Sequence, residues 1–123
     1  IKENFSEEKL ASIFYNSVYG LAYLHSIDIF YSDMKPDNLL VFRDMQVKLG
    51  DFGVTCKLES KEKDFDTLKY YAKGCSARFV PQDFMERFDP PGESPMSKNE
   101  MFSIDIYALK KTFQIAISLV KEH

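Results

Sequence analysis

The chain has 123 residues, of which 45% are hydrophobic and 28% are charged, and its formal net charge is −3. This composition is typical of one globular domain and excludes a disordered chain. The slight negative charge argues against nucleic acid as a partner, because nucleic acid favours a basic surface. No apolar run reaches the roughly 18 residues of a membrane span, so we expect no membrane association.

The two cysteines, Cys56 and Cys75, are too few for a disulfide framework and form no CxxC metal pair. They are typical of a reducing compartment, so we expect a cytoplasmic protein, with the nucleus as the alternative. Because the sequence starts at Ile1 rather than Met, we also expect it to be a piece of a longer protein.

A first helix is predicted to start at Ser6, whose side-chain oxygen can accept hydrogen bonds from free backbone N–H groups. Glu7 and Glu8 place negative charge at the positive end of the helix dipole. We interpret the segment as an amphipathic helix of the core. The apolar residues at helical spacing, over about five turns, are Leu10, Ile13, Phe14, Val18, Leu21, Ala22 and Leu24.

A short strand and a loop are predicted after this helix. The sequence IDIF (27–30) is β-branched and aromatic, as is typical of a strand. Pro36 lacks an N–H group and disfavours helical backbone at Lys35. The sequence therefore predicts a loop over residues 33–38.

A tight hairpin of two short strands is predicted next, because LLVF (39–42) and QVKL (46–49) flank RDM. In GDFG (50–53), two glycines permit unusual backbone angles around the Asp and the Phe. Residues 54–79 contain no long periodic run. They predict a long connection, of the kind that is usually functional or disordered.

The last part of the chain predicts a short helix within 80–88, a surface loop over 89–97 and a second long helix over 99–121. Its apolar residues lie nearly all round, which predicts a buried helix. They are Phe102, Ile104, Ile106, Leu109, Phe113, Ile115, Ile117, Leu119 and Val120.

One group of polar residues predicts a site that binds a metal ion and transfers a phosphoryl group. Loops at the same end of the hairpin would bring Asp33, Asn38 and Asp51 together. The amide oxygen of Asn38 and the carboxylate of Asp51 are hard ligands that suit Mg²⁺, which binds through few side chains plus phosphate oxygens. Asp33 is then left to orient a hydroxyl nucleophile or accept its proton, and Lys35 can neutralise charge that develops on a transferred phosphoryl group.

The stretch YSDMKPDNLL (31–40), followed by DFG (51–53), resembles the catalytic loop and the metal-binding triplet of eukaryotic protein kinases. GLAYLHSIDIF (20–30), GCSARFVPQ (74–82) and SIDIYAL (103–109) are similar to the neighbouring segments of that family. They occur in the same order, so the resemblance covers nearly the whole chain.

The resemblance implies an α+β fold that corresponds to the larger, C-terminal lobe of a kinase domain, mainly helical with short β-hairpins. Residues 1–123 would form an incomplete catalytic domain. The smaller lobe and the last helices of the larger lobe would be absent, so we expect the fragment itself to be inactive and the smaller lobe to be its partner in the full-length protein.

The resemblance also implies roles for single residues. Asp33 would be the catalytic base and Lys35 would contact the γ-phosphate of ATP. Asn38 and Asp51 would bind Mg²⁺, and Leu40 would lie under the adenine ring. The Lys within MKPDN is similar to the subgroup that acts on Ser and Thr, so the protein substrate would offer one of these hydroxyls.

Three further residues would have supporting roles. Tyr31 and Phe52 would stack in an internal hydrophobic column. Asp105 would brace the backbone of the catalytic loop, and the alternative is a helix N-cap or a surface acid. His25 is expected to cap or pack near the end of the first helix.

The chain also departs from the family pattern. Ser32 replaces an Arg and lacks the guanidinium that could pair with a phosphorylated loop, so we do not expect the common switch by loop phosphorylation. Candidate acceptors are nevertheless present, namely Thr67, Tyr70 and Tyr71.

Further departures lie after this loop. Cys75 stands where the family has a Thr that bonds the catalytic Asp and Lys, and a thiol bonds poorly. Gln82 replaces a Glu that forms a buried ion pair, and Lys110 falls where Gly is common. Two hypotheses follow: an ATP- and Mg²⁺-dependent protein serine/threonine kinase, or a pseudokinase-like binding and scaffold module.

Overall fold

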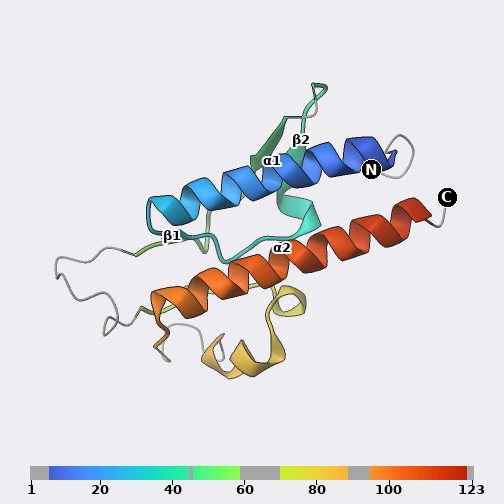
Figure 1. Ribbon diagram of the computed structural model, residues 1–123. Helices are drawn as coiled ribbons and strands as arrows, with labels where there is room; N and C mark the ends of the chain where they lie inside the picture. Colours follow the sequence, from blue (N-terminus) through green and yellow to red (C-terminus); the bar gives the residue numbers. More distant parts are fainter. Residues whose placement is uncertain (1–5, 45, 59–69, 89–94, 122–123) are drawn as a thin grey trace.

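The computed structural model describes residues 6–44, 46–58, 70–88 and 95–121, with residues 120 and 121 described by their backbone alone. Two long helices, α1 (Glu7–Ser26) and α2 (Lys98–Lys121), lie side by side and run in opposite directions (Figure 1). The short strands and turns between them lie around this pair. The architecture is α+β, as predicted.

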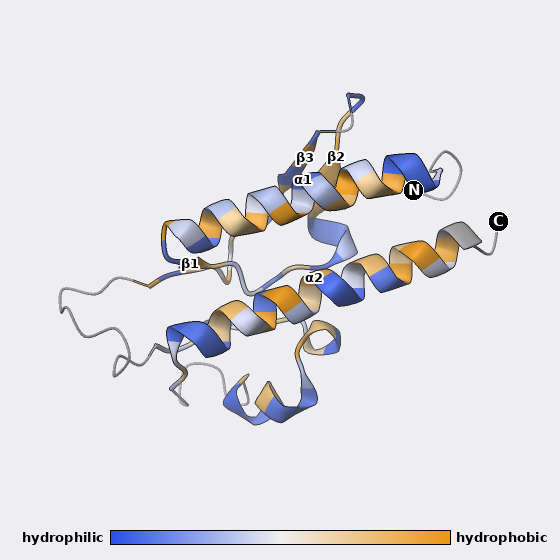
Figure 2. Ribbon diagram, in the orientation of Figure 1, coloured by the Kyte–Doolittle hydropathy of each residue, from blue (hydrophilic) through white to orange (hydrophobic). Residues whose placement is uncertain are grey.

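Helix α1 begins as predicted. The Ser6 side chain accepts a hydrogen bond from the backbone N–H of Lys9 at 3.3 Å, and two acidic residues occupy the first turn. The helix is amphipathic: Ile13 and Leu21 are buried, whereas Tyr15, Tyr19 and Tyr23 are each more than 60% exposed. The ribbon in Figure 2 alternates between hydrophilic and hydrophobic residues along this helix.

The strands form two separate antiparallel pairs. Strand β1 (Ile29–Phe30) pairs with β4 (Cys56–Lys57), and β2 (Leu39–Val41) pairs with β3 (Val47–Leu49). The predicted hairpin is confirmed, with strands one residue shorter on each side of the turn. Strand β4 was not predicted, because two residues are too few to give a periodic signal.

The predicted loop over 33–38 contains a single 3₁₀ turn, Pro36–Asn38, with the proline in its first position. A proline is tolerated there because its missing N–H would have no partner in the turn. The short helix predicted within 80–88 is also 3₁₀ and spans Gln82–Phe88. Of the predicted loop over 89–97, residues 89–94 lie outside the described residues.

Helix α2 begins one residue before its predicted start, in a reciprocal capping arrangement. The Glu100 N–H donates to Ser97 Oγ at 3.1 Å, and the Ser97 N–H donates to Glu100 Oε1 at 2.9 Å. Arg87, from the preceding 3₁₀ helix, forms an ion pair with the same carboxylate. These contacts tie the start of α2 to the segment before it.

The prediction that α2 is buried all round is wrong. Ile106 and Ile117 are each 43% exposed and Tyr107 is 37% exposed. Burial instead recurs at helical spacing on one side, at Ile104, Asp105, Ala108, Leu109, Thr112 and Phe113. In the described part of the chain, no helix is long and apolar enough to span a membrane.

Helix α2 contributes to two clusters of buried side chains. Its first turns join a cluster with Phe30 and Leu58, and its middle joins a second cluster with Tyr31 and Met34. In the second cluster, the ring of Phe113 meets the ring of Phe14 on α1 edge-on at 4.6 Å. The segment that carries the predicted site therefore lies directly on α2.

Replacing Phe113 by Ala should lower the free energy of unfolding by about 3–5 kcal/mol, because it leaves a cavity between the long helices. The matched control is Ile117→Ala on the same helix, which removes a half-exposed side chain and should cost clearly less. Urea unfolding of both variants measures the difference. Equal losses would contradict the described packing of α2.

Glu100 should contribute stability that depends on pH. The Ser97 N–H bond, together with the Arg87 guanidinium, holds the pKa of Glu100 below its usual range. A lowered pKa in the folded state adds stability above the unfolded value, and this stability is lost as the pH falls through the folded pKa.

Glu100→Gln keeps an acceptor for Ser97 and removes only the charge. It should cost about 0.5–1 kcal/mol at pH 7, and the difference from the wild type should shrink below about pH 4.5. Urea unfolding across this range measures it, with exposed Glu86→Gln as the control. A difference that stays constant with pH would exclude a role for the charge.

Candidate active site

The backbone of the predicted catalytic loop is fixed by Asp105 of helix α2. The Tyr31 N–H donates to Asp105 Oδ2 and the Ser32 N–H donates to Asp105 Oδ1, both at 2.9 Å. Asp105 is 1% exposed and lies inside α2, so it is neither an N-cap nor a surface acid. The predicted bracing role is confirmed.

A third donor reaches the same carboxylate. His25 Nε2 lies 2.8 Å from Asp105 Oδ2, and its ring stacks on Phe102 with the centroids 4.0 Å apart. Burial raises the pKa of Asp105, while the bonds from His25 and the two backbone N–H groups act in the opposite direction. His25 thus packs near the end of α1, as expected, and links α1 to α2.

Three residues that are not glycine have left-handed backbone in this region. The φ angles are 62° at Asp28, 71° at Ser32 and 51° at Asp51. Such angles are uncommon for residues with a side chain and persist where the surrounding contacts enforce them. At Ser32, the bond from its N–H to Asp105 provides one such contact.

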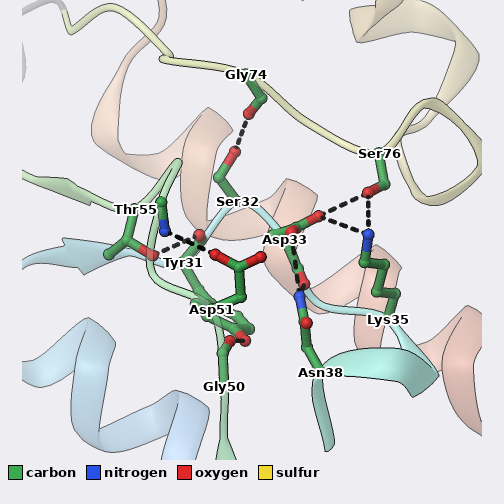
Figure 3. Close-up of polar contacts among 11 residues, drawn as sticks. Tyr31, Ser32, Asp33, Lys35, Asn38, Gly50, Asp51, Thr55, Gly74 and Ser76 are labelled. Atoms are coloured by element: carbon green, nitrogen blue, oxygen red, sulfur yellow. Dashed lines mark hydrogen bonds and ion pairs between the residues drawn. The ribbon is translucent and has the colours of Figure 1, made fainter.

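Asp33 is buried, and its two carboxylate oxygens are held from different sides (Figure 3). Asn38 Nδ2 donates to Oδ2 at 3.1 Å and to the Asp33 backbone carbonyl at 2.7 Å. Ser76 Oγ donates to Oδ1 at 2.6 Å, and Lys35 Nζ lies 3.7 Å from the same oxygen. The carboxylate therefore has one fixed orientation.

Asp51 lies at the end of the hairpin, next to the same loop. The Gly50 N–H donates to the backbone carbonyl of Asn38 at 2.8 Å, which joins the two segments. The Gly53 N–H donates to Asp51 Oδ1 at 3.1 Å. Figure 3 shows the Asp51 carboxylate facing the same space as Asp33 and Asn38, so the structure brings the three predicted residues together.

The expected column of Tyr31 and Phe52 is only partly internal. The two rings are in contact, with centroids 5.4 Å apart, and Tyr31 is fully buried, but Phe52 is 51% exposed. The Tyr31 hydroxyl donates to the Gly50 carbonyl. Burial and the charges of Asp33 and Asp51 raise the pKa of Tyr31, so the hydroxyl stays protonated. Leu40, on β2, is half exposed.

The last part of the predicted long connection (54–79) brings a residue that the sequence did not predict. Ser76, rather than Cys75, bonds both Asp33 and Lys35; the Lys35 Nζ to Ser76 Oγ distance is 3.0 Å. The only signal in the sequence is a hydroxyl one position after the cysteine. Burial and the nearby Asp33 raise the pKa of the Cys75 thiol, so it stays protonated.

The other residues that differ from the family pattern lie on or near the surface. Gln82 and Lys110 are exposed. Among the candidate phosphate acceptors, Tyr71 is 54% exposed, whereas Tyr70 forms an isolated backbone pairing with Met96. Thr67 lies outside the described residues.

The amide oxygen of Asn38 and the carboxylate of Asp51 are oxygen groups of the kind that Mg²⁺ prefers. Across the described ranges, no group of three or more His, Cys, Asp or Glu side chains could hold a metal alone. Asn38 Nδ2 is engaged by Asp33, which leaves the amide oxygen for another partner. The Asp51 carboxylate accepts only one backbone bond among the described contacts. An Asn and an Asp fit an ion that also takes phosphate oxygens.

Comparison with known proteins decides the family. The model of the protein kinase domain matches residues 1–111. The chain belongs to the protein kinase domain family. Its catalytic loop, DFG triplet and central helix are thus those of a kinase domain, and the resemblance found in the sequence is confirmed.

Several known kinases are similar to this kinase domain. The serine/threonine-protein kinase PLK4 of Drosophila virilis is 40% identical over 68 residues, which is 55% of this chain and 9% of that protein. The phosphorylase b kinase gamma catalytic chain, liver/testis isoform, of Mus musculus is 40% identical over 58 residues, 47% of this chain and 14% of that protein.

A third relative covers more of the chain. The membrane-associated tyrosine- and threonine-specific cdc2-inhibitory kinase wee-1.3 of Caenorhabditis elegans is 28% identical over 116 residues, 94% of this chain and 16% of that protein. The kinase domain sequence thus spans between 9% and 16% of the length of these three relatives.

Asp105→Asn should loosen the catalytic loop. An amide offers one acceptor oxygen instead of two, so either Tyr31 or Ser32 keeps a buried N–H group without a partner, at a cost of about 1–3 kcal/mol. Hydrogen exchange of these two amides should accelerate, and exposed Asp83→Asn serves as the control. Unchanged exchange in Asp105→Asn would show that other contacts fix the loop.

Proposed function

We propose that the protein transfers the γ-phosphoryl group of ATP to a Ser or Thr hydroxyl of a protein substrate. The 123 residues supply the base and the metal ligands for this reaction. They constitute a partial catalytic domain, the larger lobe without its last helices, and the smaller lobe that closes over ATP belongs to the rest of the protein.

The observation that carries the proposal is the fixed carboxylate of Asp33. It is buried, it accepts bonds from Asn38 and Ser76, and Lys35 lies beside it. A carboxylate held in one orientation by uncharged donors and a cation suits a group that must point at an acceptor hydroxyl, because a misplaced base loses rate steeply.

The proposed reaction uses this arrangement. The acceptor hydroxyl oxygen forms a bond to the γ-phosphorus of ATP, and the bond between that phosphorus and the oxygen of ADP breaks. The hydroxyl proton passes to Asp33. Lys35, next to Asp33, neutralises negative charge on the phosphoryl group during transfer.

Asn38 and Asp51 would hold Mg²⁺, which neutralises charge on the phosphate oxygens when it is bound. Leu40 would lie under the adenine ring; it is 46% exposed on strand β2, at the edge of the site. Leu40 and Phe52, 46% and 51% exposed, would face the smaller lobe in this proposal.

The acceptor class is proposed from the relatives and from Lys35. Two of the relatives described above are a serine/threonine-protein kinase and a phosphorylase kinase chain, whereas the third is named as tyrosine- and threonine-specific. Assays with matched peptides that differ only in a Ser, Thr or Tyr acceptor will therefore test the class. Faster transfer to Tyr than to Ser and Thr would contradict it.

One observation favours a second candidate, a pseudokinase that binds partners without turnover. Gln82 is exposed and carries no charge, so the buried ion pair that the family forms at this position is missing. A pseudokinase would bind nucleotide or partners and give no transfer in any variant. The following experiment separates the two candidates.

Asp33→Asn and Asp51→Asn should each lower kcat by at least about 100-fold, because they remove the proton acceptor and the carboxylate ligand. The assay uses Mg-ATP, a protein substrate and the protein expressed from its complete gene. Asp37→Asn, exposed in the same loop, is the matched control and should be near wild type. Transfer that survives both substitutions would disprove the roles, and a wild type without transfer would favour the pseudokinase.

A further inference from the structure

Two exposed basic residues lie next to the backbone that contacts Asp33. Ser76 Oγ donates to Asp33 Oδ1 at 2.6 Å, so the backbone around Ser76 lies beside the carboxylate at which an acceptor hydroxyl would bind (Figure 3). Lys73 precedes Ser76 by three residues and Arg78 follows it by two, and both are exposed. A bound substrate would therefore meet positive charge close to its acceptor.

The position of Arg78 is supported by an aromatic ring. Arg78 lies inside the 3₁₀ helix η2 (Ala77–Phe79), in which the Phe79 N–H donates to the Ser76 carbonyl at 2.9 Å. Phe79 is 8% exposed and belongs to the same buried cluster as Met34 of the catalytic loop. The Arg78 guanidinium lies 5.7 Å from the centroid of the Phe79 ring, a distance at which a cation is attracted to an aromatic face. The ring thus favours one region of the surface for a flexible side chain.

The charges of these two basic residues are not balanced by neighbouring carboxylates. Among the described residues, neither Lys73 nor Arg78 forms an ion pair. Asp83 and Glu86 are exposed acids a few residues further along the chain, and they form no ion pair with either cation. An arginine in this state can pair with an anion that arrives on another molecule.

Chain geometry limits which part of a bound substrate Arg78 can contact. Two residues span at most about 7 Å, so the Cα atoms of Ser76 and Arg78 lie within this distance of each other. An extended peptide advances about 3.3 Å per residue. A peptide with its acceptor hydroxyl at Asp33 would therefore bring to Arg78 a residue that lies one to three positions from the acceptor.

We propose that Arg78 selects protein substrates that carry an Asp or Glu within three positions of the acceptor hydroxyl. The proposal rests on the proposed function, because it concerns the substrate of that same site. A guanidinium presents parallel N–H donors that match the two oxygens of a carboxylate, so Arg78 can form a two-point contact with an acidic residue. A basic residue at the same place in the substrate is repelled, and Lys73 adds to this repulsion.

Peptide kinetics with the protein expressed from its complete gene test the proposal. The peptides share one Ser acceptor and differ by an Asp, Ala or Lys at a single position, from three before to three after that acceptor. At one position or more, kcat/KM should be about fivefold higher for Asp than for Ala, as expected for one exposed ion pair, and lowest for Lys. Arg78→Ala should remove the preference and leave kcat/KM for the Ala peptide within about twofold of the wild type. Arg78→Glu should favour Lys.

A matched variant and a change of salt separate selection from a structural role. Arg43→Ala removes the same charge from an exposed arginine at the turn of the β2–β3 hairpin, and it should keep the preference for Asp. The preference should also shrink at least about twofold when the salt concentration rises from roughly 0.05 M to 0.5 M, because salt screens exposed charges. A purely structural role of Arg78 would not produce a preference with this salt dependence.

Binding provides a second readout that needs no turnover. Peptides with Ala in place of the acceptor Ser are labelled, and fluorescence anisotropy compares the binding of those with Asp and with Lys. This readout decides the proposal if no phosphoryl transfer is detected, a result that would count against the proposed function instead. The selection by Arg78 is disproved if Asp, Ala and Lys peptides are used and bound equally, or if the preference for Asp survives Arg78→Ala.

Discussion

Two consecutive backbone N–H groups, those of Tyr31 and Ser32, donate hydrogen bonds to the carboxylate of Asp105. This side chain is almost completely buried. A buried carboxylate is costly unless its oxygens are bonded, so its position and that of the loop determine each other. His25 adds a donor from the other long helix. The direction of Asp33, the next residue along the chain, follows from this arrangement.

The rest of the site is assembled around Asp33 by short-range bonds from separate segments. Asn38 comes from the 3₁₀ turn, Ser76 from the last part of the predicted long connection and Lys35 from the loop itself. Uncharged donors supply two of these three contacts. A carboxylate surrounded in this way keeps its orientation while it remains able to accept another bond, since each oxygen has two lone pairs.

The sequence predicted the features whose signals are local. The serine at the start of α1, the proline of the 3₁₀ turn and the strands around RDM each have a direct backbone cause, and all three were found. Strand β4, the exposure of Ile106 and the bond from Ser76 to Asp33 depend on which segments meet in space. The periodicity of one segment does not show which other segment it contacts. The family pattern places Cys75, rather than Ser76, where the family has the Thr that bonds the catalytic Asp and Lys.

Three residues with left-handed backbone, Asp28, Ser32 and Asp51, lower stability but carry side chains with contacts of their own. A glycine at position 28, 32 or 51 would remove a steric cost of roughly 1–2 kcal/mol. At Asp28 it would sacrifice a partly exposed ion pair with Lys98, whereas at Ser32 it would remove a buried hydroxyl bond and at Asp51 a carboxylate. Selection for heat resistance alone should therefore enrich glycine first at 28. Under the proposed function, selection for turnover should keep the side chains at 32 and 51 despite their left-handed backbone.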